Sequence, residues 1–71
     1  MAMNVTVASP MRALLRKNHI TAREVAHRMG MSESGLSRLL NGSRPWRLRH
    51  LRAMSLVTGI PMATLRTAVD L

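Results

Sequence analysis

The sequence predicts an all-α fold, a compact bundle of five short helices. Apolar residues recur three and four positions apart in five successive stretches, as on the buried side of an amphipathic helix. Glycine, asparagine or proline residues separate these stretches. Apolar residues make up 46% of the 71 residues but include a single aromatic, Trp46, so the core has to consist of Leu, Met, Val and Ile.

The chain predicts one domain, residues 9–71, preceded by an N-terminal arm, residues 1–8. The arm alternates apolar and polar side chains, which indicates an extended segment. Because a lone strand cannot satisfy its own backbone hydrogen bonds, the arm is either a flexible tail or a strand that pairs with a symmetry mate or lies on the domain. We favour the tail.

The first helix is expected from Ser9 to about Asn18. Ser9 followed by Pro10 is typical of an N-cap and the first helical position. The residues with the spacing of one buried stripe are Met11, Leu14 and Leu15.

The second helix is expected to begin after Thr21, where Glu24 three residues later completes a capping box. Gly30 ends this helix as a left-handed residue would. The residues expected to face the core are Val25, Ala26 and Met29. The small side chain of Ala26 would let two helices cross closely.

The third helix is expected to follow almost at once, with Ser32 as its N-cap and Asn41-Gly42 as its end. Its buried side would consist of Leu36, Leu39 and Leu40. The second helix, the glycine turn and the third helix have the order of parts of a helix-turn-helix, which sets one helix into the DNA major groove.

A loop over residues 43–47 is expected to lead into a fourth helix, residues 47–58, which Gly59 and Pro61 end. Its inward positions would be Leu48, Leu51 and Met54, with Ser55 and Thr58 at the same spacing. A last short helix is expected over residues 62–70, with its buried side formed by Met62, Leu65 and Val69.

The chain is strongly basic, with a net charge of +8 and eleven basic residues against three acidic ones. Such an excess implies a polyanionic partner, most often nucleic acid. Ten of the eleven cations are arginine, which the codon bias of a GC-rich genome would also favour. Placement favours a functional basic face, because four arginines follow directly behind the third helix: Arg44, Arg47, Arg49 and Arg52.

Other classes of protein are disfavoured. Without cysteine the chain has neither disulfides nor thiolate zinc ligands, and no metal or cofactor is expected. The three histidines lack metal-ligand spacing and are expected at the surface: His19, His27 and His50. We expect no enzyme, because paired carboxylates and a phosphate-binding loop are missing. No apolar run approaches the ~20 residues of a membrane span, and the start lacks signal-peptide features, so a cytoplasmic location is expected.

Residues 20–60 resemble the Cro/lambda-repressor type of helix-turn-helix domain, and the segment VAHRMGMSESGLSRLLNG is especially similar. The residues that carry the resemblance are Ile20-Thr21, Val25-Ala26, Met29-Gly30-Met31-Ser32, Leu36-Ser37-Arg38, Asn41-Gly42, Leu48, Leu51, Gly59 and Ile60. The resemblance implies a lambda-repressor-like bundle that binds double-stranded DNA.

The resemblance implies base contacts from the start of the third helix and from one turn later, at Ser32, Glu33, Ser34, Ser37 and Arg38. The chemistry of Arg38 agrees, since its planar guanidinium suits O6 and N7 of guanine. Glu33 stands where the family commonly has glutamine. Its carboxylate can accept from cytosine N4, but it repels phosphate and could instead orient Arg38 or serve the helix N-terminus.

The resemblance matches Asn41 to a phosphate contact, beside a simple role in ending the helix, and Arg44 to a basic residue that often follows it. Ala22 departs from the family, where glutamine often holds the phosphate and the recognition helix together. Without that clamp, neighbouring Arg23 is expected to take over the phosphate. The phosphate contacts expected are Arg23, Asn41, Ser43, Arg44 and Arg47.

A dimer interface is expected at the C-terminal end. It would form from an exposed apolar patch of Leu56, Val57, Met62, Val69 and Leu71, unless some of these close the core. Two-fold pairing there would set two recognition helices one DNA turn, ~34 Å, apart. Trp46 has three possible places, in order of preference: over the loop between the third and fourth helices, in a dimer interface, or against the DNA backbone.

The leading hypothesis is a sequence-specific transcriptional regulator, a Cro-like repressor that occupies a pseudo-palindromic operator as a homodimer in a bacterium or a phage-infected cell. Two alternatives keep the DNA binding. One is an antitoxin whose apolar C-terminal patch masks a toxin. The other is an architectural or excision factor with little sequence preference. The sequence does not identify a protein partner.

Overall fold

The computed structural model describes residues 10–71; the predicted arm and Ser9 lie outside the described residues. The described chain forms five helices and no strand, which confirms the predicted all-α fold. In chain order they are α1 (Pro10–Lys17), α2 (Ala22–Met29), α3 (Glu33–Asn41), α4 (Leu48–Thr58) and α5 (Met62–Val69). At 11 residues, α4 is the longest of them, and none of the described helices is long and apolar enough to cross a membrane.

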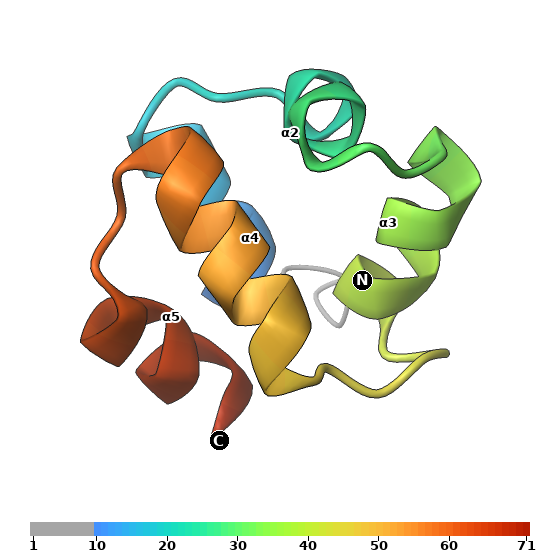
Figure 1. The fold of residues 1–71 in the computed structure, drawn as a ribbon. Coiled ribbons are helices and arrows are strands. Elements are labelled where there is room, and N and C mark those ends of the chain that lie inside the picture. Colours follow the sequence, from blue (N-terminus) through green and yellow to red (C-terminus); the bar gives the residue numbers. More distant parts are fainter. Residues whose placement is uncertain (1–9) are drawn as a thin grey trace, which may run out of the picture.

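The helices pack around α4, which lies in front of α1 in the middle of Figure 1. α2 packs against both α3 and α4, and α5 packs against both α1 and α4. α3 packs against α2 and buries Leu36, Leu39 and Leu40 in the core, while its opposite face is turned outward.

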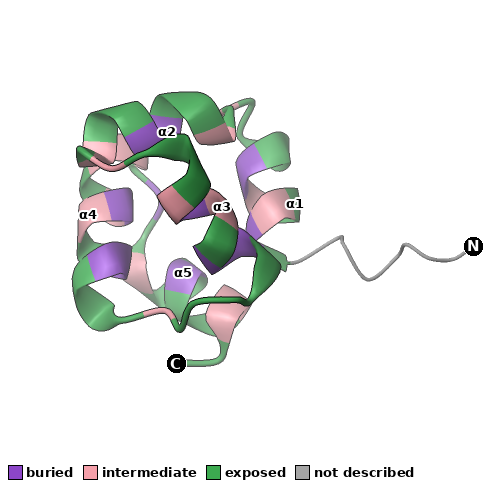
Figure 2. Ribbon diagram, turned by 90° about the vertical axis from the view of Figure 1, so that its right-hand side faces the viewer, coloured by how far each residue is buried: buried purple, intermediate pink, exposed green. Residues whose placement is uncertain are grey.

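The core takes residues from all five helices, and Figure 2 shows the buried positions on their inward sides. Short helices have narrow apolar faces, so each one buries only one to three side chains there. The buried apolar residues are Met11, Leu15, Val25, Ala26, Leu36, Leu39, Leu40, Leu51, Met54, Ile60 and Leu65. The predicted stripes of the first three helices are thus confirmed, with Leu14 and Met29 packed at the edge of the core.

The ends of α2 show one part of the prediction confirmed and one part wrong. The Thr21 hydroxyl accepts a hydrogen bond from the Glu24 N–H at 3.1 Å, as an N-cap should. The Glu24 carboxylate accepts from Arg28 Nη2 at 2.8 Å and does not complete the capping box. The reason is that an arginine one turn later offers a charged donor, a stronger partner than a backbone amide.

The turn between α2 and α3 follows the prediction. Gly30 adopts a left-handed conformation with φ of 74°, which a residue with a Cβ rarely adopts. The Ser32 hydroxyl then accepts from the Gly35 N–H at 3.0 Å and begins α3. α3 ends at Gly42, also left-handed with φ of 83°.

Leu51 and Met54 of α4 are buried as the sequence predicts, but the first turn of the helix differs from the prediction. Leu48, expected in the core, is 45% exposed, whereas His50, expected at the surface, is only 6% exposed. The buried stripe consists of His50, Leu51 and Met54, which lie three and four positions apart. The predictions for Leu48 and His50 are both wrong for one reason. The spacing of Leu48 also fits the buried stripe, but the packing at the start of the helix buries His50 in its place.

The half-buried hydroxyls near the end of α4 form hydrogen bonds with backbone groups of that helix end and of the segment that leads to α5. The Ser55 hydroxyl donates to the Ile60 carbonyl at 2.6 Å, and the Thr58 hydroxyl donates to the Met54 carbonyl at 2.7 Å. The Ile60 N–H donates in turn to the Thr58 hydroxyl at 3.2 Å. These bonds explain why polar residues are tolerated at the spacing of the apolar stripe.

Candidate nucleic-acid interface

The outward face of α3 carries the residues expected to read bases. Glu33, Ser34 and Arg38 are exposed and Ser37 is half-buried, while the opposite face of the helix is buried in the core. Residues three and four positions apart are neighbours on a helix surface, so these four side chains share one face. Ser32, just before the helix, is exposed as well.

The Ser32 hydroxyl already has two partners within the protein. It accepts from the Gly35 N–H and lies 3.3 Å from the Ser34 hydroxyl. A hydroxyl has one hydrogen to donate and two lone pairs, so Ser32 can cap the helix and still donate. Its capping role reduces the freedom with which it could meet a base.

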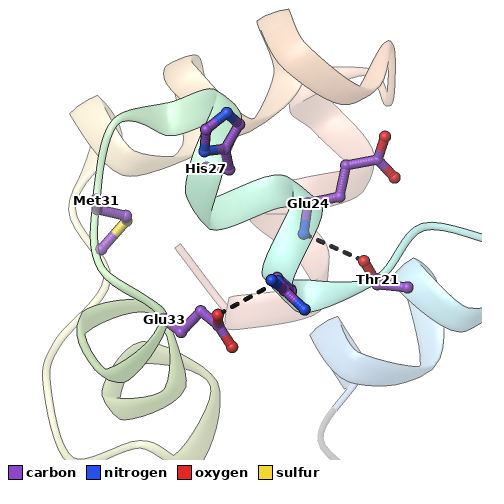
Figure 3. Close-up of a pocket in the computed structure, with 6 residues that line it drawn as sticks. Thr21, Glu24, His27, Met31 and Glu33 are labelled. Carbon is purple, nitrogen blue, oxygen red and sulfur yellow. Dashed lines mark hydrogen bonds and ion pairs between the residues drawn. The ribbon is translucent and has the colours of Figure 1, made fainter.

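Glu33 pairs with Arg23 of α2. The carboxylate Oε2 lies 3.6 Å from Arg23 Nε, and both side chains are largely exposed, at 68% and 84% (Figure 3). An exposed pair of this length contributes little to stability. It does hold the two side chains across the turn, so the partner of the Glu33 carboxylate is Arg23, whereas the sequence suggested Arg38.

Two hollows flank this pair. One, of about 580 Å³, lies over α2 and is drawn in Figure 3; its lining is Thr21, Arg23, Glu24, His27, Met31 and Glu33. The second, of about 340 Å³, we call the three-helix hollow, because it lies where α1, α2 and α3 meet. Its lining is Arg12, Ala22, Arg23, Glu33, Ser34, Ser37 and Leu40.

Asn41 lies at the end of α3 and is held by two side chains. Its Oδ1 accepts from Arg12 Nη2 of α1 at 2.7 Å, and its Nδ2 donates to the Ser37 hydroxyl at 3.4 Å. No functional role is expected of Arg12 from the sequence. No sequence signal could have found it, because Arg12 and Asn41 are 29 positions apart.

The segment after α3 folds back onto the helix. The N–H groups of Ser43 and Arg44 both donate to the Arg38 carbonyl, at 2.9 and 3.2 Å. The Arg44 side chain reaches toward the first turn of α3, where its Nη1 lies 4.0 Å from the place that a Cβ on Gly35 would take. Arg44, expected among the phosphate contacts, thus has its charge beside the residues expected to read bases.

The start of α4 is built around buried His50. The imidazole Nδ1 of His50 accepts from the Arg47 backbone N–H at 3.0 Å. The backbone N–H of His50 donates in return to the Arg47 carbonyl at 3.0 Å. Trp46 is half-buried against the core, and its ring meets the imidazole edge-on at a centroid distance of 6.2 Å. This position fits the first of the three places considered for Trp46.

Positive charges surround this histidine. Burial lowers the pKa of His50 below its usual 6.5, and the charges of Arg44, Arg49 and Arg47 lower it further. The charges of three of the four arginines behind α3 thus act on the histidine at the start of α4.

The residues expected at a dimer interface divide into two groups. Leu56 is 86% exposed and Leu71 is 46% exposed. Val57 is half-buried, and Met62 and Val69 are half-buried against the core. The last two therefore help to close the core and offer less surface to a partner.

Among residues 10–71, no three His, Asp or Glu side chains gather as a metal site would require. A family model described as helix-turn-helix matches residues 11–65, from the first buried residue of α1 to the buried leucine of α5. Comparison with curated proteins and with solved structures gave no match.

Proposed function

Because the chain belongs to this helix-turn-helix family of DNA-binding proteins, we propose that it is a sequence-specific transcriptional regulator, a Cro-like repressor. Residues 9–71 would act as one DNA-binding domain, working in the cytoplasm of a bacterium or of a phage-infected cell. The observation that carries the proposal is the outward face of α3, where polar side chains and Arg38 are exposed and the Arg44 side chain reaches the first turn of the helix.

Base reading is assigned to the side chains on the outward face of α3. Arg38 reads guanine through two parallel hydrogen bonds to O6 and N7, and the Ser34 and Ser37 hydroxyls accept or donate to neighbouring bases. Ser32 and Glu33 complete the set at the helix start. Glu33 accepts from cytosine N4 while Arg23 offsets part of its repulsion of the phosphates.

Backbone positioning is assigned to the segment after α3. Ser43, Arg44 and Arg47 lie between the end of α3 and the start of α4, together with Asn41 and, from α2, Arg23. The first turn of α4 contains no acidic residue, so the partial positive charge of the helix N-terminus adds to that of the arginines. A phosphate placed there would meet both.

Repression would follow from occupancy of a pseudo-palindromic operator by a homodimer. The proposed contact uses the exposed Leu56 and Leu71 with the half-buried Val57, Met62 and Val69 at its edge. The observation that supports such a contact is the 86% exposure of Leu56, a large apolar side chain. Two-fold symmetry would space the two copies of α3 by one DNA turn, ~34 Å.

The test separates reading from positioning. A duplex selected from a random library and its scrambled counterpart are titrated with the protein at two salt concentrations. Arg38→Ala should lose discrimination at one base pair, by roughly 1–3 kcal/mol. Arg44→Ala should weaken binding to both duplexes alike and flatten the salt dependence.

Two results would contradict the proposal. If the wild-type protein bound selected and scrambled duplexes equally, a low-specificity architectural factor would replace the repressor. If the two substitutions gave the same phenotype, the division into reading and positioning residues would be wrong. Sedimentation of the free protein over a concentration series tests the homodimer separately.

A further inference from the structure

We propose that Arg12 and Asn41 together form a further phosphate-binding site at the three-helix hollow, which takes one phosphodiester of the DNA backbone. The inference rests on the proposed function, because it assumes that α3 faces a duplex. It adds α1, which the sequence treats only as part of the bundle, to the DNA-binding surface.

The contact between Arg12 and Asn41 is short and joins two helices. At 2.7 Å, the bond from Arg12 Nη2 to Asn41 Oδ1 is as short as the hydrogen bonds that charged donors make. It joins α1 to the last residue of α3 and fixes the guanidinium at the edge of the recognition helix. The charge is therefore positioned before any ligand arrives, which reduces the entropy lost on binding.

The three-helix hollow leaves space for a ligand beside this contact. The lining of the three-helix hollow includes Ala22, whose side chain ends at Cβ, together with Ser34 and Ser37 of the reading face. A longer residue at position 22 would project into this space. The hollow opens on the same side as Ser34, so a duplex that α3 reads would pass over it.

The hydrogen-bonding groups of Arg12 and Asn41 suit a phosphate. The Asn41 amide directs its oxygen to Arg12, which leaves its NH₂ group for an acceptor, and the existing bond from Nδ2 to Ser37 is long at 3.4 Å. A guanidinium has five N–H donors, so the bond to Asn41 uses only part of its capacity to bind several acceptors at once. Asn41 thus supplies a neutral donor and Arg12 supplies the charge that Asn41 lacks.

One residue of the lining opposes the site. Glu33 carries a negative charge at the same hollow, and Arg23 lies 3.6 Å from its carboxylate. The charges of the pair offset each other in part, and Arg12 adds a further positive charge to the lining of the hollow.

Arg16 provides a matched control, since it lies one turn further along α1, is exposed and carries the same charge, but does not line the hollow. Affinity for the selected and scrambled duplexes is measured for Arg12→Ala and Arg16→Ala over a salt series. Arg12→Ala should weaken binding to both duplexes roughly tenfold and reduce the slope of log K against log salt by about 0.9. Arg16→Ala should leave the slope unchanged.

Arg12→Lys separates a phosphate contact from a purely structural link between α1 and α3, and a double-mutant cycle tests whether Arg12 and Asn41 act as one site. Arg12→Lys keeps the charge and should keep the salt slope, even though it loses the planar fork. Arg12→Ala and Asn41→Ala should be non-additive in a double-mutant cycle for DNA affinity, because each removes part of one site. All titrations are made well below the melting temperature of each variant, measured by circular dichroism.

Three results would overturn the inference. These are equal salt slopes for Arg12→Ala and Arg16→Ala, additive effects of Arg12→Ala and Asn41→Ala, or an affinity loss in Arg12→Ala that disappears once the unfolded fraction is subtracted. In each case a wild-type protein that still prefers the selected duplex leaves the proposed function standing. A wild-type protein without that preference would instead remove the proposed function itself.

Discussion

At the start of α3 the Ser32 hydroxyl accepts the N–H of a first-turn residue, whereas at the start of α4 the buried imidazole of His50 accepts the N–H of the N-cap residue, Arg47. The serine is the common solution, since a short hydroxyl reaches the first turn without leaving the surface. The arginine before α4 cannot act in this way, because a guanidinium has no acceptor. The helix therefore begins with an acceptor from its own third residue.

The two helix starts also differ in charge. α3 has Glu33 in its first turn, and this acid complements the helix dipole and pairs with Arg23. The first turn of α4 has no acid, and the charges of Arg44, Arg47 and Arg49 act on its histidine. The start of α3 thus has an acid of the protein to offset part of the positive charge there, while the first turn of α4 has no acid to offset the arginines that act on its histidine.

The largest effect on stability is expected when the hydrogen bond that caps the start of α4 is removed. His50→Ala leaves the Arg47 N–H without its acceptor and opens space beside Trp46, so the free energy of unfolding should fall by about 2 kcal/mol. Urea unfolding followed by circular dichroism measures it. His27→Ala, at an exposed position of α2, is the control and should change stability by less than about 0.5 kcal/mol. Equal losses in the two variants would mean that His50 does not hold the start of α4.

A smaller effect is expected when the cap of α3 is removed. Ser32→Ala loses the bond to the Gly35 N–H, which then turns to water, and stability should fall by about 1 kcal/mol. Ser32→Thr keeps the hydroxyl and should recover most of this loss in the same unfolding measurement. If Ser32→Ala cost more than His50→Ala, the buried cap would not be the stronger of the two.

The smallest expected effect is a dependence of stability on pH. Of the two capping side chains, only the His50 imidazole titrates near neutral pH, whereas the Ser32 hydroxyl does not. The pKa of His50 is lowered in the folded protein, so the folded state favours the neutral imidazole. The stability that this provides is complete above the ordinary pKa of 6.5 and is lost as the pH falls from there toward the lowered value. The free energy of unfolding should therefore decline as the solution is acidified below that point.

Melting temperatures of the wild type and of His50→Gln between about pH 8 and pH 5 measure this effect, the range spanning the ordinary histidine pKa. Glutamine can accept a hydrogen bond but does not titrate, and both proteins keep His19 and His27. The two curves should diverge only on the acidic side. Parallel curves would show that protonation of His50 does not weaken the start of α4.

The order and ends of the helices follow from the sequence, because the interactions that decide them span only a few residues. Gly30, Gly42 and Gly59 end helices in the left-handed conformation, and the Thr21 and Ser32 hydroxyls each bond three residues ahead. Such interactions are readable from residue type and spacing alone. The roles expected of individual residues on the DNA-facing surface stay predictions, and Arg38 is the one whose chemistry supports its role most directly.

What only the tertiary structure decided is which residue of the first turn of α4 faces the core and which distant side chains meet. Spacing alone fits either Leu48 or His50 to the buried stripe, and the packing of α4 on its neighbours selects His50. The bond between Arg12 and Asn41 and the pairing of Arg23 with Glu33 join different helices. The sequence determines local backbone structure because capping and glycine conformation act over one turn, whereas rotation about a helix axis is decided by the total contact surface of the bundle.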